Sequence, residues 1–248
     1  MNYKLSKSTY VKGCQCEKAL WLNKHKPELK DKITDKQQHI FDNGHAVGYL
    51  AQKLFPNGID LEQNYNHRDY ETSLQKMTEL LKLENVSIYE APFLYNEVLS
   101  IMDVLNIKDG KAIAYEVKSS TSVTDCYLKD CALQYYVMTH SGLQLEDFNI
   151  VYVNNQYVKN GELDLNEFFI IESVLERILE LQPDVEANIE KFKSVLELAE
   201  VPEIGIGPQC EDPYTCNFKS HCWENVPDMR RPQKRAGAPY FPVPGPEI

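Results

Sequence analysis

The sequence lacks any long hydrophobic run. No segment of the 248 residues approaches the roughly 18 consecutive apolar residues that a membrane-spanning helix needs. The first residues, MNYKLSKSTYVKG, also lack the apolar stretch of a secretory signal peptide. We therefore expect a cytoplasmic protein that does not interact with a membrane.

The chain also has few basic residues for its acidic content. Its 26 Lys and Arg against 37 Asp and Glu give a net charge of -11, which argues against a nucleic-acid partner. The charge is uneven, however, because residues 1–36 hold nine lysines against four acidic residues, and residues 217–248 hold five basic against three acidic residues. Basic ends on an acidic body allow a nucleic-acid path near the termini, and a solvated lysine-rich surface would have the same composition.

Internal repeats and low-complexity segments are absent from the sequence, so its organisation is inferred from periodicity and turn residues. With 43% hydrophobic residues the chain can bury a sizeable core. The patterns predict helices over 33–56 and 69–84, strands over 86–95, 98–107 and 111–118, a helix ending at Gly142, a strand over 147–155 and two helices over 165–200 broken near Pro183. This order is typical of an α/β domain with a mixed central sheet.

The first predicted helix has an apolar stripe running from Ile40 to Leu54. Gly44 and Gly48 lie one turn apart on or beside this stripe, where they reduce helix propensity. We therefore expect the stripe to be buried, with another backbone packed closely against the glycines.

A hairpin is predicted within residues 102–120, MDVLNIKDGKAIAYEVKSS, where two β-prone segments flank an Asp-Gly pair at 109–110. A two-residue type I′ turn at this pair aligns positions whose numbers sum to 219. Asp103 then lies opposite Glu116.

A second, weaker turn signal at 96–97 aligns positions that sum to 193, which places Glu90 opposite Asp103. Glu90, Asp103 and Glu116 then form one row across three strands, and Lys118 lies on the same face. Opposed like charges destabilise a sheet, so we expect a divalent cation to neutralise them. Mg²⁺ or Mn²⁺ suits such oxygen ligands and, beside a lysine, supports phosphodiester hydrolysis. A solvated edge face would look similar, because Glu-x-Lys is common by chance.

Asp103 followed thirteen residues later by Glu-Val-Lys resembles the core of the PD-(D/E)xK nuclease superfamily. The resemblance implies a restriction-endonuclease-like sheet flanked by helices, metal ligation by Asp103 and Glu116, and a catalytic role for Lys118. The segment LQYYVM resembles the glutamine motif of the RecB-like branch, which implies that Gln134 belongs to the site. Met138 occupies the position where that branch usually has a tyrosine.

Seven cysteines, an odd number, are concentrated near the two ends of the chain. Cys210, Cys216 and Cys222 are separated by five residues each, and Cys14 and Cys16 lie near the N-terminus. In a reducing compartment this grouping indicates metal or cluster ligation rather than disulfides. Four thiolates suit either a [4Fe-4S] cluster or tetrahedral Zn²⁺, and the wide gaps differ from the CxxC pairs usual for zinc.

One N-terminal and three C-terminal cysteines resemble the iron-sulfur nucleases of the RecB-like branch, which include CRISPR-adaptation exonucleases and AddB-type helicase-nucleases. The segment LSKSTYVKGCQCEKALWL resembles the N-terminal signature of an uncharacterised bacterial RecB-like family. This resemblance implies Cys16 as the fourth ligand, with Cys14 as the alternative, and a cluster that joins 1–36 to 205–226. Cys126 and Cys131 are expected to be core residues.

The segment FDNGHAVGYLAQKLFPNG is similar to the same family. In better-known relatives a helix histidine completes the metal site, and Gly48 holds its position in this sequence. His45, one turn earlier, is the alternative metal ligand or else a surface histidine. The loss of the usual ligand leaves open an impaired enzyme.

The resemblance extends in patches from about residue 3 to residue 223 and implies a nuclease domain over 1–226, followed by an extended Pro-rich tail over 227–248. The resemblance implies DNA as the partner. Members of the family are often longer, so a partner protein or a second, exonuclease-like domain is also expected. Three hypotheses follow: an exonuclease acting on single-stranded DNA or DNA ends, a catalytically impaired iron-sulfur module that binds nucleic acid, and a zinc-stapled interaction protein.

Overall fold

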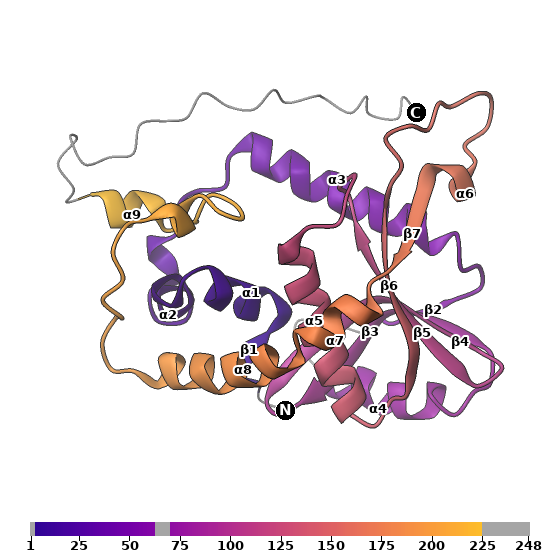
Figure 1. Ribbon diagram of the computed structural model, residues 1–248, viewed down its shortest axis with the longest axis horizontal. Coiled ribbons are helices and arrows are strands. Elements are labelled where there is room, and N and C mark those ends of the chain that lie inside the picture. Colours follow the sequence, from indigo (N-terminus) through magenta and orange to yellow (C-terminus); the bar gives the residue numbers. More distant parts are fainter. Residues whose placement is uncertain (1–2, 63–69, 225–248) are drawn as a thin grey trace.

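The computed structural model describes residues 3–62 and 70–224. The predicted tail over 227–248 lies outside the described residues. Within them the chain forms a seven-stranded mixed sheet flanked by helices (Figure 1), as the order of predicted elements indicated. Within the described residues no helix is long and apolar enough to cross a membrane.

The strands of the sheet pair in the order β2-β3-β4-β5-β6-β7, and β1 pairs with β4. Their bounds are β1 (Leu5–Ser6), β2 (Ile59–Asp60), β3 (Val86–Tyr95), β4 (Val98–Lys108), β5 (Lys111–Lys118), β6 (Leu145–Val153) and β7 (Phe169–Ser173). The helices are α1 (Lys7–Gln15), α2 (Glu17–His25), α3 (Asp35–Gln52), α4 (Tyr70–Leu80), α5 (Asp125–His140), α6 (Leu165–Phe168), α7 (Leu175–Glu180), α8 (Gln182–Glu197) and α9 (Lys219–Trp223), with 3-10 turns η1 (Pro27–Leu29) and η3 (Pro208–Cys210).

Both predicted hairpin registers are confirmed. In the β4–β5 hairpin Val104 pairs with Tyr115, and in the β3–β4 hairpin Tyr89 pairs with Val104, so the aligned numbers sum to 219 and 193. The four turn residues have the positive φ angles that type I′ turns require, namely 48° at Asn96, 57° at Glu97, 52° at Asp109 and 74° at Gly110.

Strands β1 and β5 pair with the same edge of β4, at different positions along it. The β4–β5 pairing ends at Val104 and Tyr115, after which β5 continues beside β6 alone. Farther along the same strand, β1 pairs in parallel with β4 at Val98 and Leu99. The stretch of β4 between these two pairings therefore lacks a ladder partner on this edge, and Asp103 lies within it.

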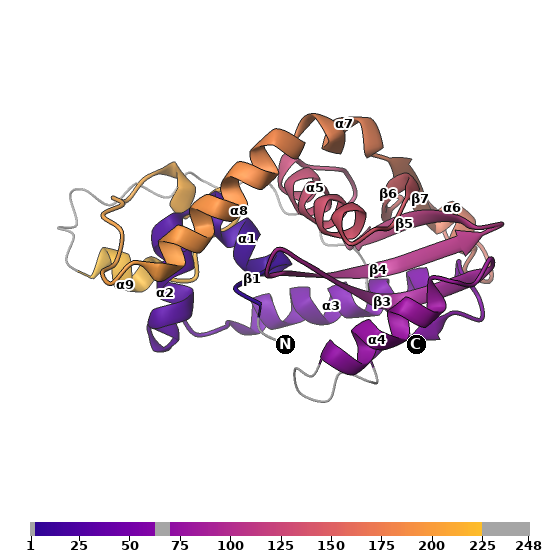
Figure 2. The ribbon, with the colours of Figure 1, turned by 90° about the horizontal axis from the view of Figure 1, so that it is seen from below.

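The helices cover both faces of the sheet (Figure 2). Helices α5 and α7 lie on one face, and α3 and α4 lie on the other. Helix α5 packs through buried residues that include Leu133 and Val137, whereas the C-terminal half of α3 packs through Ala51 against Val151 and Val153. The central strands are thus held from both sides.

Two expectations about the elements were wrong. The apolar stripe of α3 is not buried along its length, since Ile40 and Phe41 are 51% and 50% exposed. A Cβ atom at Gly44 or Gly48 would meet no atom within 4 Å, so no backbone packs against these glycines. The segment 169–173, expected to be helical, forms strand β7 at the edge of the sheet, where β6 supplies its hydrogen bonds.

The N-terminal and C-terminal segments of the described chain lie together at one end of the molecule, beside α8 (Figure 1). The side-chain amide of Gln15 donates hydrogen bonds to the carbonyl groups of Gln209 and Tyr214, at 2.9 and 2.7 Å. Lys12 donates to Asn217 Oδ1 at 3.0 Å. The predicted meeting of the two ends therefore occurs through protein contacts.

Candidate active site

The predicted row of carboxyl groups lies on β3, β4 and β5. Glu90 and Asp103 occupy aligned positions, because Tyr89 pairs with Val104 and Ala91 pairs with Met102 on either side of them. The ladder skips the Glu90–Asp103 pair itself, and Glu90 has a φ of 51°. A residue other than glycine in this left-handed region costs on the order of 1–3 kcal/mol.

Asp103 lies where β5 leaves β4. Its Oδ2 accepts a hydrogen bond of 2.7 Å from the backbone amide of Val117. A side chain on β4 thus bonds the backbone of β5 just beyond the last ladder pair. This contact holds the Asp103 carboxylate beside Glu116, its neighbour in the predicted row.

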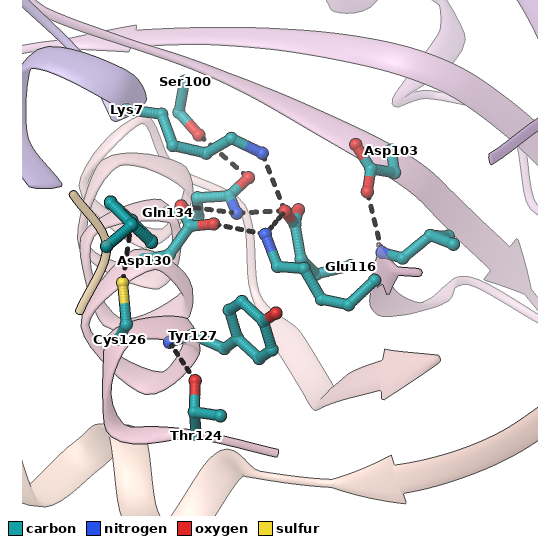
Figure 3. A network of polar contacts seen from close by, with 12 residues as sticks. Lys7, Ser100, Asp103, Glu116, Thr124, Cys126, Tyr127, Asp130 and Gln134 are labelled. Carbon is teal, nitrogen blue, oxygen red and sulfur yellow. Dashed lines mark hydrogen bonds and ion pairs between the residues drawn. The ribbon is translucent and has the colours of Figure 1, made fainter. Parts of the chain in front are cut away.

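Glu116 is the most buried of the three carboxyl groups, with its side chain 1% exposed. One oxygen, Oε1, accepts from the ammonium groups of Lys118 at 2.6 Å and Lys7 at 2.8 Å. The other, Oε2, accepts from the side-chain amide of Gln134 at 2.8 Å, and Ser100 donates to that amide's oxygen at 3.3 Å (Figure 3). Every oxygen of this buried carboxylate is therefore hydrogen-bonded.

Lys118 connects the row of carboxylates to helix α5. Its ammonium group bonds Asp130 Oδ2 at 2.6 Å in addition to Glu116, and it lies 5.2 Å from the centroid of the Tyr127 ring. Asp130 precedes Gln134 by one helical turn, so the two side chains point to the same face of α5.

Sequence reasoning missed both other charged members of this network, Lys7 and Asp130. Asp130 had a usable signal, because it lies four residues before Gln134 in a helix whose face was already assigned to the site. Lys7 had no local signal, since 109 residues separate it from Glu116 and only the short strand β1 brings it there.

A groove of about 470 Å³ opens over these groups. Its walls include Lys7, Ile40, Phe41, Gly44, His45, Gly48, Gln52, Glu90, Asp103, Val104, Glu116, Val117, Lys118, Ser119 and Tyr127. His45 and Gly48 thus belong to the same groove as the carboxyl row, on the α3 side. His45 is exposed, and within the described residues it has no ion pair with a carboxyl group.

Burial and mutual repulsion shift the titration of the row. Burial, followed by the charge of Asp103, raises the pKa of Glu90 to about 8. Burial and Glu116 likewise raise the pKa of Asp103. For Glu116 burial acts in the same direction, but Lys118 and Lys7 outweigh it and hold the pKa of that carboxyl below its usual range. Glu116 is therefore the member that stays ionised.

The donor chemistry of the groove suits a hard divalent cation. Three carboxyl groups, those of Glu90, Asp103 and Glu116, line the groove together with the ammonium groups of Lys7 and Lys118. Carboxylate oxygens are the ligands that Mg²⁺ and Mn²⁺ prefer. Among residues 3–62 and 70–224, no three His, Cys, Asp or Glu side chains are arranged so that they could hold a metal ion.

The cysteines near the two ends influence one another. Burial raises the pKa of the Cys222 thiol, and the thiols of Cys216, Cys210 and Cys16 raise it further. The backbone amide of Cys216 also donates to the carbonyl group of Cys210 at 2.9 Å.

Cys14 has different neighbours. Burial raises the pKa of its thiol to about 11, and the other groups that affect it are Lys129, Tyr10 and Cys126. Cys131 is fully buried in the core, and Cys126 is half-buried with its sulfur 3.0 Å from the hydroxyl of Tyr214. Cys16 thus influences the thiol of Cys222, whereas the groups that influence Cys14 are different ones.

Comparisons with known proteins give only distant likenesses. No family model and no curated protein matches the chain. Among solved structures, the crystal structure of the protein SSO0001 is 11% identical, with a TM-score of 0.37, over 81% of this chain and 78% of that one. An alkaline exonuclease from Laribacter hongkongensis is 10% identical, with a TM-score of 0.34, over 78% of this chain and 90% of that one.

Proposed function

We propose that this protein is a metal-dependent DNA nuclease of the PD-(D/E)xK superfamily, RecB-like branch, with that superfamily's restriction-endonuclease-like fold. It hydrolyses phosphodiester bonds in single-stranded DNA or at DNA ends. The observation that supports the proposal is the environment of Glu116. This buried carboxylate is hydrogen-bonded by Lys118 and Gln134 and lines the same groove as Asp103. Motif residues from β4, β5 and α5 meet there.

In this proposal Asp103 and Glu116 hold Mg²⁺ or Mn²⁺, with Glu90 in support and His45 as a further ligand on the α3 side. Such a cation, when bound, would lower the pKa of a water and would stabilise negative charge on the phosphate. Gln134 fixes the orientation of Glu116 through the bond to Oε2. The carboxyl oxygens that line the groove support this assignment, because they are the ligands that such a cation prefers.

Lys118 acts as a fixed cation. Although burial opposes it, Asp130 and Glu116 raise the pKa of Lys118 well above its usual range, so the ammonium group stays protonated. It can therefore orient the attacking water by donating a hydrogen bond and can stabilise negative charge, but it does not accept a proton. Asp130 holds it in place through the bond of 2.6 Å.

The apolar side of the groove supports single-stranded DNA as the substrate. Ile40 and Phe41 are about half exposed on α3, and Tyr127 lines the same groove. Unpaired bases stack on such side chains, whereas paired bases in a duplex are already stacked. A DNA strand with its backbone over the carboxyl row would have its bases within reach of this wall.

The four cysteines Cys16, Cys210, Cys216 and Cys222 are proposed to bind a [4Fe-4S] cluster that holds the two ends of the chain together. Support comes from their shared influence on one another's thiols and from the protein contacts that already join these segments. Zn²⁺ would use the same thiolates, and colour separates the two, because an iron-sulfur protein is brown and zinc is silent. Reduced thiols and such a cluster fit a cytoplasmic location.

The decisive test is cleavage by anaerobically purified protein. End-labelled single-stranded and double-stranded DNA are incubated with Mn²⁺ or Mg²⁺, alongside the variants Glu116→Ala and Lys118→Ala. Cleavage that needs the metal and is lost in both variants supports the nuclease. The matched control is Lys111→Ala on the same strand, an exposed lysine paired with Glu146, which should cleave like the parent.

A second candidate is a nucleic-acid-binding module that keeps the fold and cluster but has lost catalysis. Gly48 favours it, because this position in α3 lines the groove and offers no metal ligand. In that case the folded, brown protein binds DNA with an affinity that falls as salt rises, and no metal produces cleavage. In either case a partner protein or a second exonuclease-like domain would complete its action on DNA.

A further inference from the structure

Lys7 is fixed to the sheet by the short segment before it. Strand β1 pairs with β4 through Leu5 and Ser6, and Ser6 then caps α1. The Ser6 amide donates to Thr9 Oγ1 at 2.7 Å, and the Thr9 amide donates back to Ser6 Oγ at 3.4 Å. Helix α1 therefore begins at Lys7 in a defined position, next to the stretch of β4 that lacks a ladder partner.

The same helix is pressed against α8. Tyr10 contacts the Phe192 ring edge-on, with 5.4 Å between centroids, and a Cβ atom at Gly13 would lie 2.8 Å from that ring. Only glycine permits this approach without a shift of the ring. Helix α1 is thus held at its start and along its second half. This fixes the backbone of Lys7, while its side chain can move.

Lys7 and Lys118 share one carboxylate oxygen but differ in their other partners. Lys118 also has Asp130 at 2.6 Å, and its side chain is 17% exposed. Lys7 has a single acid within ion-pair distance in the described part of the chain, Glu116, and its side chain is 28% exposed on the wall of the groove. If Glu116 takes another cation, Lys118 keeps its ion pair with Asp130, whereas Lys7 keeps only the longer-range attraction of Asp130 and Asp103.

We infer that Lys7 is a second functional lysine, which occupies Glu116 in the metal-free protein and contacts a phosphate of the DNA strand when Glu116 binds the divalent cation. The inference rests on the proposed function, because it assigns a step to the same groove. An ammonium group released beside the carboxyl row faces the groove, where a phosphate is the complementary charge. Lys7 then adds to affinity for DNA and opposes binding of the metal alone.

The first test measures Mn²⁺ binding without DNA, by electron paramagnetic resonance of the free ion. Lys7→Met removes the competing ammonium, so Mn²⁺ should bind about fivefold more tightly than in the parent, as expected for losing one nearby like charge at the edge of a protein. The control is Lys4→Met, three residues earlier and paired with Glu97 and Glu197 on the surface, which should match the parent.

The second test measures binding of a fluorescein-labelled oligothymidylate by anisotropy, with Ca²⁺ in place of Mn²⁺. One lost phosphate contact lowers the slope of log affinity against log salt by about 0.7 for a single strand. Lys7→Met should show this loss, Lys7→Arg should restore the slope, and Lys4→Met should keep it. If the Met variant does not fold, Lys7→Gln takes its place, because it can still donate a hydrogen bond to Glu116.

The outcomes separate the two proposals. Unchanged Mn²⁺ affinity or an unchanged salt slope in Lys7→Met overturns the role of Lys7, even if the parent cleaves DNA. A parent that binds Mn²⁺ and DNA but never cleaves overturns the nuclease, and the two binding measurements still decide the role of Lys7. A parent that binds neither overturns both.

Discussion

The backbone amide of Val117 donates a hydrogen bond to Oδ2 of Asp103 at 2.7 Å. The last ladder pair between their strands is Val104 with Tyr115, so the carboxylate takes over where backbone pairing stops. One side chain therefore bridges the opening between β4 and β5 and also offers oxygen to the groove. The hydrogen bond from Val117 stabilises the folded protein, whereas the negative charge of Asp103 beside Glu116 destabilises it.

Replacing Asp103 separates these two effects. Asp103→Asn keeps an oxygen that accepts from Val117 and removes the charge, so its free energy of unfolding at pH 8 should equal or exceed that of the parent. Asp103→Ala leaves the amide unpaired and should lower it by about 1–3 kcal/mol. Urea denaturation without metal measures both, and both variants should lose cleavage. An Asn variant as unstable as the Ala variant would contradict this account of the bond.

The stability of the metal-free protein should fall as pH rises from about 4.5 to about 8. The pKa of Glu90 is raised to about 8 from an ordinary value of 4.5, so in this window the folded state binds more protons than the unfolded state. Raising pH therefore favours unfolding, by at most about 1.4 kcal/mol per pH unit for this group. Asp103 acts in the same direction at the acidic side of the window.

Thermal unfolding of the metal-free protein between pH 5 and pH 8.5 measures this decline, and Glu90→Gln should flatten it. Below the window the sign reverses, because the pKa of Glu116 is held low by Lys118 and Lys7 against burial, and stability is lost as this group is protonated. Saturating Mn²⁺ should also flatten the decline. A parent whose stability rises steadily from pH 5 to pH 8.5 would contradict the raised pKa of Glu90.

Gly48→His should strengthen metal binding. A Cβ atom at this position meets nothing within 4 Å, and the position lines the groove above the carboxyl row. One added ligand contributing about 1.4 kcal/mol would raise Mn²⁺ affinity about tenfold. Isothermal titration measures this, and Gly44→His, one turn earlier on the wall of the same groove, is the comparison.

Both substitutions replace a glycine within α3, so both should raise the free energy of unfolding by about 0.3 kcal/mol through helix propensity. An equal gain in stability with a gain in Mn²⁺ affinity only at position 48 is the expected pattern. Equal affinities for the two variants would mean that position 48 does not face the carboxyl row.

The hairpins were predictable because their registers depend on short segments. The Asp109-Gly110 turn sets the alignment of β4 with β5, and from it the placement of Asp103 and Glu116 follows by counting. Gln134 was singled out through a motif, and the structure shows its side-chain amide bonded to Glu116. Elements whose signals are local, such as β3 to β5 and α5, were therefore recovered, with ends that differ from the predicted ones by two residues at most.

What could not be predicted depends on contacts far apart in sequence. Lys7 reaches Glu116 through β1, a strand of two residues with no periodicity of its own. Strand β7 was hidden, since FIIES continues a segment with helical spacing, and only the free edge of β6 selects the extended form. The stripe on α3 has the pattern of a buried face, yet at Ile40 and Phe41 it borders the groove, because binding surfaces use the same apolar residues as cores.

The cysteine region and the carboxyl groove are connected by a single helix, and this gives a last prediction. Helix α1 begins with Lys7 at Glu116 and ends at Gln15, where the backbone amide of Cys16 caps it by donating to the carbonyl group of Lys12. A cluster bound by Cys16, Cys210, Cys216 and Cys222 would therefore fix the end of α1 opposite to the groove.

Cys16→Ser should lose most of the iron and the brown colour, whereas Cys14→Ser should keep both, because Cys14 lies instead with Tyr10 and Cys126. Iron content and visible absorbance measure the difference. Hydrogen exchange should then accelerate across residues 7–15 in the Cys16 variant only, since Gln15 and Lys12 lose the fixed partners that hold α1 to the C-terminal segment. Iron retained in Cys16→Ser and lost in Cys14→Ser would reverse the ligand assignment. Iron loss without faster exchange would show that protein contacts alone hold α1, and that Lys7 keeps its position whether or not the thiolates are occupied.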